Sequence, residues 1–101
     1  VNQVWKGRRF KTNTYKDYEN DLFAILPNIK LPEEKLELNI EIGFSSKSSD
    51  IDNCIKPFID VLQKAYNFND KNIYRLNITK IDVKKGAEFI NFCFLPFRVI
   101  I

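Results

Sequence analysis

The sequence predicts a single α+β domain in which two helices pack on a mixed β-sheet, with the elements in the order α-β-α-β-β. The chain has 101 residues, which is enough for one hydrophobic core but not for two. Two segments with helical hydrophobic spacing alternate with segments of period-two hydrophobicity. A helix separates the first two predicted strands and a short turn joins the last two, a combination that is typical of a mixed sheet.

The first predicted helix begins near Tyr15 and ends before Pro27. Thr14 is a plausible N-cap, and Lys16, Glu19 and Asn20 fall on the other faces of the helix. The apolar face consists of Tyr15, Tyr18, Leu22, Ile25 and Leu26.

The second element is a strand over residues 36–44, which follows a loop over residues 28–34. Leucine, isoleucine and phenylalanine alternate there with glutamate and asparagine, so one face of the strand is buried. A polar loop over residues 45–49 leads into a second helix that ends near Tyr66. Because proline disrupts a helix interior, one option is that the regular helix starts near Lys56, with Pro57 in its first turn.

The last third of the chain predicts two strands. The first starts at Tyr74, and its hydrophobic phase flips at Thr79–Lys80, which indicates a bulge. Residues 84–87 read as a hairpin turn. The final strand, 89–95, is apolar on both faces and ends at Pro96, so we expect it to be central or covered by a partner.

Composition excludes several kinds of chemistry. The chain has no histidine, which rules out Ser-His-Asp and Cys-His nucleophilic sites and His-ligated zinc within this chain. Cys54 and Cys93 are too few for a disulfide scaffold, and we expect reduced core thiols in a cytoplasmic protein. No apolar run is long enough to span a membrane, and the basic, polar start does not resemble a signal segment.

The charge distribution is asymmetric. Residues 1–16 form a basic arm with five cationic side chains and no acid, whereas the rest of the chain carries a net charge of −2. A basic arm on a nearly neutral body suits a phosphate backbone as partner, although an ordinary solvated flank would look the same. Aromatic side chains in the arm could stack on bases or belong to the core or to an interface. These are Trp5, Phe10 and Tyr15.

The residues best suited to chemistry are Asp50, Asp52, Lys56, Asp60 and Asp70. Converging carboxylates repel one another unless a cation sits among them or one of them is protonated. Oxygen ligands favour Mg²⁺, with Mn²⁺ as a plausible substitute, and such an ion can activate water and neutralise a phosphate oxygen. The plainer alternative is that the aspartates are caps and turn residues and that Lys56 and Asp60 form a surface pair.

The position of Asp70 relative to the other two aspartates depends on strand pairing. Asp50 follows one predicted strand, whereas Asp70 precedes the next. If those strands are parallel neighbours, Asp70 lies at the end of the sheet opposite to Asp50. A short helix or antiparallel pairing would bring both to the same end.

A longer pattern in the same region resembles the RusA family of Holliday junction resolvases. The similarity runs from about residue 44 to about residue 91, and the arm also resembles the start of the family through Asn2, Trp5, Arg8, Lys11 and Tyr15. The pattern consists of Ser49-Asp50-Ile51-Asp52-Asn53, Lys56-Pro57, Asp60, Leu62, Asn69-Asp70, Ile73 and Lys80.

The resemblance implies a RusA-like fold and a Mg²⁺-dependent endonuclease that cuts four-way DNA junctions during recombination and repair. It implies that Asp50, Asp52 and Asp70 form the catalytic metal site and that Lys56 is the essential lysine. It also implies a homodimer that nicks two symmetric strands, often carried by a prophage, with no organic cofactor. We expect Lys6, Arg8, Arg9, Lys11 and Lys47 to hold DNA phosphates.

The sequence departs from the family pattern at three places. Asn69-Asp70 stands where an Asp-Asp pair is frequent, and only Lys47 is charged in the stretch before Asp50, where some members are more basic. From the resemblance we also expect that most of the family's opening strand is missing from the sequence before Val1. Two other functions remain open at this point, a less selective metal nuclease and a non-catalytic module that binds branched or single-stranded DNA.

Overall fold

The structure is a computed structural model that describes residues 3–6, 15–32, 34–48 and 51–99. Its elements confirm the predicted α+β class. In chain order they are β1 (Gln3–Lys6), α1 (Tyr15–Ile25), β2 (Leu36–Phe44), α2 (Ile51–Tyr66), the short 3₁₀ helix η1 (Asp70–Asn72), β3 (Ile73–Asp82) and β4 (Phe89–Pro96).

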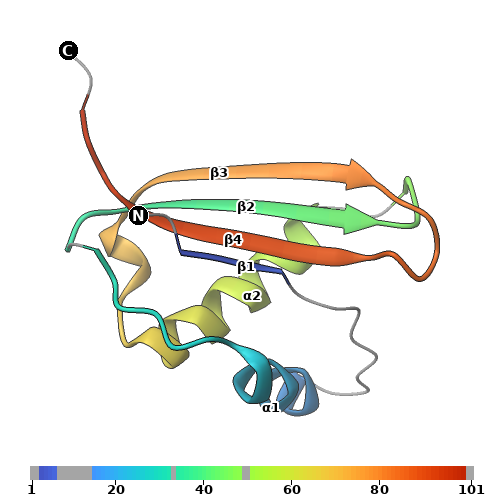
Figure 1. Cartoon of the computed structure of the whole chain (residues 1–101), viewed down its shortest axis with the longest axis horizontal. Coiled ribbons are helices and arrows are strands. Elements are labelled where there is room, and N and C mark those ends of the chain that lie inside the picture. Colours follow the sequence, from blue (N-terminus) through green and yellow to red (C-terminus); the bar gives the residue numbers. More distant parts are fainter. Residues whose placement is uncertain (1–2, 7–14, 33, 49–50, 100–101) are drawn as a thin grey trace.

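The four strands form one mixed sheet in the order β1-β4-β2-β3. β2 pairs with β3 in parallel and with β4 antiparallel, and β1 pairs antiparallel with the other edge of β4. Both helices lie on the same side of this sheet, and α2 connects the two parallel strands (Figure 1). Parallel neighbours need such a crossover, because a hairpin can join only antiparallel strands.

The core lies between the sheet and the helices. β2 buries every second side chain, which confirms its predicted alternation. The ring of Phe58 from α2 packs edge-on against Phe92 of β4, with centroids 5.7 Å apart. Each fully buried side chain of this kind contributes about 1.5–3 kcal/mol. The buried apolar residues are Leu22, Leu36, Leu38, Ile40, Ile42, Ile55, Phe58, Ile59, Val61, Leu62, Phe92 and Phe94.

α1 has the predicted bounds, and its predicted apolar face is confirmed at Leu22 and Leu26, which pack in the core, but not at Ile25. Leu22 is fully buried, whereas Ile25 is 42% exposed. Glu19, predicted on a polar face, is buried instead, because its carboxylate accepts a 2.6 Å hydrogen bond from the Lys64 ammonium of α2. A charge is tolerated there because it is paired, and the pair ties the two helices together.

α2 starts earlier than in the predicted option, in which the regular helix begins near Lys56 and Pro57 lies in its first turn. The helix runs without interruption from Ile51, and Pro57 lies inside it. An interior proline costs roughly 3 kcal/mol in a helix. The apolar face continues on both sides of the proline, from Ile55 to Leu62, so burial of this face against the sheet offsets that cost.

The predicted hairpin between β3 and β4 is wrong. The turn itself forms, with Ala87 N–H donating to Lys84 O at 2.9 Å. However, β2 lies between the two strands that the turn connects. β4 is therefore a central strand, as its apolar faces predicted, because β1 and β2 cover its two edges.

The predicted bulge at Thr79–Lys80 is also wrong, because the pairing with β2 continues in register from Arg75 to Asp82. The irregularity lies instead at the start of β3, where Tyr74 is the extra residue. The change of hydrophobic phase along this strand instead reflects apolar packing on the face of the sheet away from the helices. A Cβ added at Gly43 would lie 2.4 Å from the Phe89 ring and 3.1 Å from Val83, so apolar side chains fill the space above this glycine on the face away from the helices.

Part of the predicted basic arm is a strand. Residues 3–6 form β1 at the sheet edge, which supplies a short leading strand that the sequence did not reveal. Residues 7–14 lie outside the described residues, as does the predicted N-cap Thr14. Both cysteines are in the described part of the chain and neither forms a disulfide. No helix in the described ranges is long and apolar enough to cross a membrane.

Candidate active site

A cleft with a volume of about 370 Å³ lies between α2 and β3. It brings together Lys56 and Asp70, two of the predicted site residues, and adds Asp60 from the same sequence pattern. Its remaining lining is apolar and comes from both elements. The full lining is Ile55, Lys56, Ile59, Asp60, Asp70, Ile73 and Leu76.

Asp70 is held in place by its backbone. Its N–H donates a 2.7 Å hydrogen bond to the side-chain oxygen of Gln63 on α2. Asn69 caps η1 by accepting a hydrogen bond from Lys71 N–H at 3.0 Å. Asparagine and aspartate cap equally well, so Asn69 keeps this positioning role where the family often has aspartate. The Asp70 carboxylate is exposed, and among the described residues it has no hydrogen-bond or ion-pair partner.

The surface-pair interpretation of Lys56 and Asp60 is not supported. Although four residues apart on α2, they form no ion pair within the described part of the chain. Asp60 instead lies 3.5 Å from the Gln63 amide nitrogen. Lys56 is exposed and lines the cleft, and its ammonium has no hydrogen-bond or ion-pair partner among the described residues.

Asp50 lies outside the described residues, and of Asp52 only the backbone position is described, in the first turn of α2. Because β2 and β3 are parallel, α2 runs from one end of the sheet to the other (Figure 1). Position 52 and Gln63, which holds Asp70, are therefore about 16 Å apart along the helix axis. Among the described side chains, no group of three or more potential ligands could hold a metal ion.

The sequence matches the family model described as endodeoxyribonuclease RusA over residues 2–90. That is most of the chain. The chain belongs to the RusA family. This confirms the family resemblance and places the chain among nucleases that act on DNA. A comparison with curated proteins finds no match.

The expected DNA-binding residues are described only in part. β1 and β2 run in the same direction, so Lys6 at the end of β1 and Lys47 after β2 belong to the end of the sheet where α2 begins. The Lys80 ammonium donates a 2.8 Å hydrogen bond to the backbone oxygen of Lys47 and so holds the loop after β2. The Lys47 side chain is exposed. Arg8, Arg9 and Lys11 lie outside the described residues.

Gln63 is a positioning residue that sequence reasoning did not single out. It contacts both Asp60 and the Asp70 backbone. Its spacing could have revealed it, because positions 52, 56, 59 and 63 follow the i, i+4, i+7, i+11 rule for one helical face. Cys54 offers no alternative nucleophile, since burial raises the pKa of its thiol and keeps it protonated near neutral pH.

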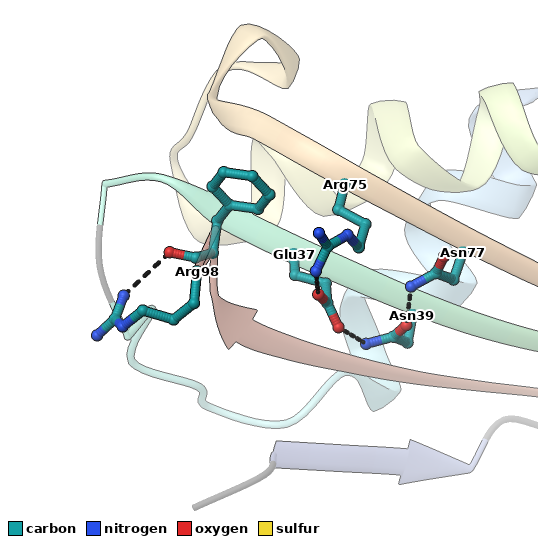
Figure 2. Close-up of polar contacts among 6 residues, drawn as sticks. Glu37, Asn39, Arg75, Asn77 and Arg98 are labelled. Carbon is teal, nitrogen blue, oxygen red and sulfur yellow. Dashed lines mark hydrogen bonds and ion pairs between the residues drawn. The ribbon is translucent and has the colours of Figure 1, made fainter. Parts of the chain in front are cut away.

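The face of the sheet away from the helices carries a polar network rather than a basic surface. Figure 2 shows Arg75 donating to Glu37, Asn39 donating to the other Glu37 oxygen, and Asn77 donating to Asn39. These hydrogen bonds are 2.7–2.9 Å long. Hydrogen bonds from Asn39 and Arg75 lower the pKa of Glu37. Glu41 adds a second carboxylate on this face, so the face does not favour phosphate binding.

This network predicts a specific acid dependence of stability. A lowered folded-state pKa stabilises the protein above the ordinary value of 4.5, and the stabilisation is lost as the pH falls through the folded-state pKa. Glu37→Gln removes the titrating group. Below pH 4.5 the free energy of unfolding should therefore fall less steeply for Glu37→Gln than for the unmodified chain, as measured by urea denaturation. Glu34→Gln, the same change at an exposed position, is the control. Identical slopes for the unmodified chain and Glu37→Gln would contradict the assignment.

Proposed function

We propose that the protein is a Mg²⁺-dependent endodeoxyribonuclease that resolves four-way (Holliday) DNA junctions by paired, symmetric nicks, in recombination and repair. The observation that supports this most strongly is the RusA family match, which includes every expected catalytic position. The cleft also supports it, because Lys56 and Asp70 both line the cleft and the Asp70 carboxylate has no partner among the described side chains.

The side chains that would hold the ion are Asp50, Asp52 and Asp70. Their carboxylate oxygens suit Mg²⁺, and Mn²⁺ accepts the same ligands. The Asp70 carboxylate fits this role because it is exposed, fixed through its backbone, and unpartnered among the described residues. A bound divalent ion lowers the pKa of water and neutralises charge on a phosphate oxygen.

The chain's own cations bind and orient the DNA. Lys56 lines the cleft, and from there its ammonium can contact the scissile phosphate and stabilise the negative charge that develops during cleavage. Lys6, Arg8, Arg9, Lys11 and Lys47 hold backbone phosphates, which positions the junction without reading its sequence. The last of these, Lys47, lies beside the start of α2 in the fold.

A homodimer would bring together aspartates that lie far apart along α2 within one chain. Position 52 and Gln63 are about 16 Å apart in one chain, too far for one ion to contact both ends of the helix. In the dimer we propose, Asp50 and Asp52 of one chain would hold the ion together with Asp70 of the other. Two identical sites then form, one for each of the two strands that are cut.

Asp52→Asn tests the proposed function. The variant should lose Mg²⁺-dependent cleavage of a four-way junction, because an amide replaces an anionic ligand, but should keep its affinity for the junction. Cleavage is measured on end-labelled junctions and binding by gel shift in Ca²⁺. Asp21→Asn on the exposed side of α1 is the matched control. Full cleavage by Asp52→Asn would remove the metal-site assignment.

Lys56→Ala tests the role of the lysine. The single-turnover cleavage rate should fall by about 100-fold or more, a typical loss when one stabilising group of a reaction is removed. The junction dissociation constant should change by less than about threefold, since one surface cation contributes little to binding. Lys30→Ala, at an exposed loop position, is the control. An unchanged rate would reassign Lys56 to the surface.

A further inference from the structure

A pair of aromatic side chains lies at the end of the sheet where β2 and β3 begin. Tyr74 of β3 is 54% exposed, and its ring packs on Phe97, the first residue after β4, with centroids 5.3 Å apart. The Phe97 N–H donates a 2.9 Å hydrogen bond to Lys35 O, which fixes Phe97 beside the start of β2. Neither ring belongs to the hydrophobic core, so packing of the core does not account for them.

The position of Tyr74 follows from the irregular start of β3. The register of β3 with β2 passes from Ile73 directly to Arg75, so Tyr74 is an extra residue. A bulge of this kind re-aims a side chain, and bulges are frequent beside functional sites. Here the bulge leaves Ile73 lining the cleft and brings the Tyr74 ring onto Phe97 instead.

Cations lie beside both rings. The Lys35 ammonium is 5.2 Å from the centre of the Tyr74 ring, and the Arg75 guanidinium is 5.1 Å from the centre of the Phe97 ring. Glu37 pairs with Arg75 (Figure 2), whereas Lys35 has no ion-pair partner in the described part of the chain. The residue after Phe97 is a further exposed cation. We call this group the aromatic–cation cluster; it consists of Lys35, Tyr74, Arg75, Phe97 and Arg98.

We propose that the aromatic–cation cluster binds a nucleobase of an unpaired DNA strand. The base stacks on Tyr74, and Lys35 and Arg98 hold the adjoining phosphates. Every nucleobase has a flat π-face, so an exposed aromatic ring can stack on it whatever the sequence. Lysine has a flexible stem of four carbons, so the Lys35 ammonium can move from the ring to a phosphate when a base stacks.

The observations favour DNA over a protein as the occupant. The chain belongs to a family of endodeoxyribonucleases, and cations around exposed rings are complementary to a strand of phosphates and bases. An apolar protein surface would have to remove water from the Lys35 ammonium without pairing it, which is costly.

The carboxylates on the same face of the sheet do not oppose this binding. Arg75 neutralises Glu37. Glu41 lies six residues beyond Lys35 along β2, which is about 20 Å. Charges separated by that distance at the surface are largely screened at physiological ionic strength.

The cluster is also close to Asp70, and in this respect the inference rests on the proposed function. Tyr74 follows Asp70 by four residues, which span at most about 14 Å. A stacked strand advances about 3.4 Å for each nucleotide, so a base on Tyr74 lies within about four nucleotides of a phosphate at Asp70. The cluster therefore favours DNA that has an unpaired strand near the cut, such as a branch point, over a continuous duplex.

Fluorescence anisotropy with two short labelled strands tests the stacking, in EDTA so that no strand is cut. One strand is oligodeoxythymidine, and the other has the same backbone without bases. The unmodified chain should bind the thymidine strand more tightly. Tyr74→Ala should raise the Kd for that strand at least about fivefold, the loss expected for one base–aromatic stack, and leave the Kd for the baseless strand within about twofold. Tyr74→Trp should keep the affinity, because it retains an aromatic ring.

Phe23→Ala is the matched control, because Phe23 is 41% exposed but lies on α1. Its affinity for both strands should equal that of the unmodified chain. Equal affinity of the unmodified chain for the two strands, or no measurable binding of either, would overturn the proposal. So would an unchanged thymidine Kd in Tyr74→Ala, and a change of sedimenting mass in that variant would then assign the cluster to a protein contact.

Lys35→Ala tests the phosphate contact. The variant should bind both strands more weakly, and the slope of log Kd against log salt concentration should fall by about 0.7, the value for one phosphate contact on a single strand. Lys30→Ala, at an exposed loop position, is the control. An unchanged slope in Lys35→Ala would contradict the role given to this lysine.

These binding measurements separate the cluster from the proposed function. A chain that cleaves junctions with Mg²⁺ but binds both strands equally well would overturn the cluster and leave the nuclease proposal intact. A chain that binds the thymidine strand through Tyr74 but cleaves no DNA would support the cluster and contradict the nuclease proposal.

Discussion

The parallel pairing of β2 with β3 is the constraint on which the rest of the structure depends. Parallel neighbours require a crossover, and this chain makes it with the 16-residue helix α2. The crossover carries the chain from one end of the sheet to the other before β3 begins. Position 52 and Asp70 therefore lie near opposite ends of α2, although 18 positions separate them in sequence. Within the described part of the chain, the backbone at position 52 and Asp70 therefore do not meet at one end of α2.

Much of the fold could be predicted because each element has its own local pattern. Alternation in β2 and the helical spacing in α2 reflect one buried face each, and both are visible in a short window of sequence. Which strands become neighbours depends on distant contacts. The turn at residues 84–87 has the chemistry of a hairpin, yet it joins strands that flank β2. Likewise Glu19 looks like a surface residue until Lys64, 45 positions later, pairs with it.

The candidate site was predictable to a similar degree. Helical spacing placed Lys56 one turn after Asp52, and the family pattern added Asp70, which lies in the same cleft as Lys56. Gln63 was not identified, because glutamine has no chemistry of its own and acts by fixing the Asp70 backbone. The exposure of Leu76 and the absence of an ion pair between Lys56 and Asp60 within the described residues become visible only in the folded chain.

Mixed dimers give the most direct test of whether two chains build each site. Asp52→Asn and Asp70→Asn chains, co-expressed with different affinity tags and purified through both, contain one substitution in each chain. If Asp52 of one chain acts with Asp70 of the other, one site in every mixed dimer is intact, and the dimer should nick a four-way junction in one strand although each parent dimer is inactive. An inactive mixed dimer, together with an active dimer that carries both substitutions in the same chain, would contradict the account.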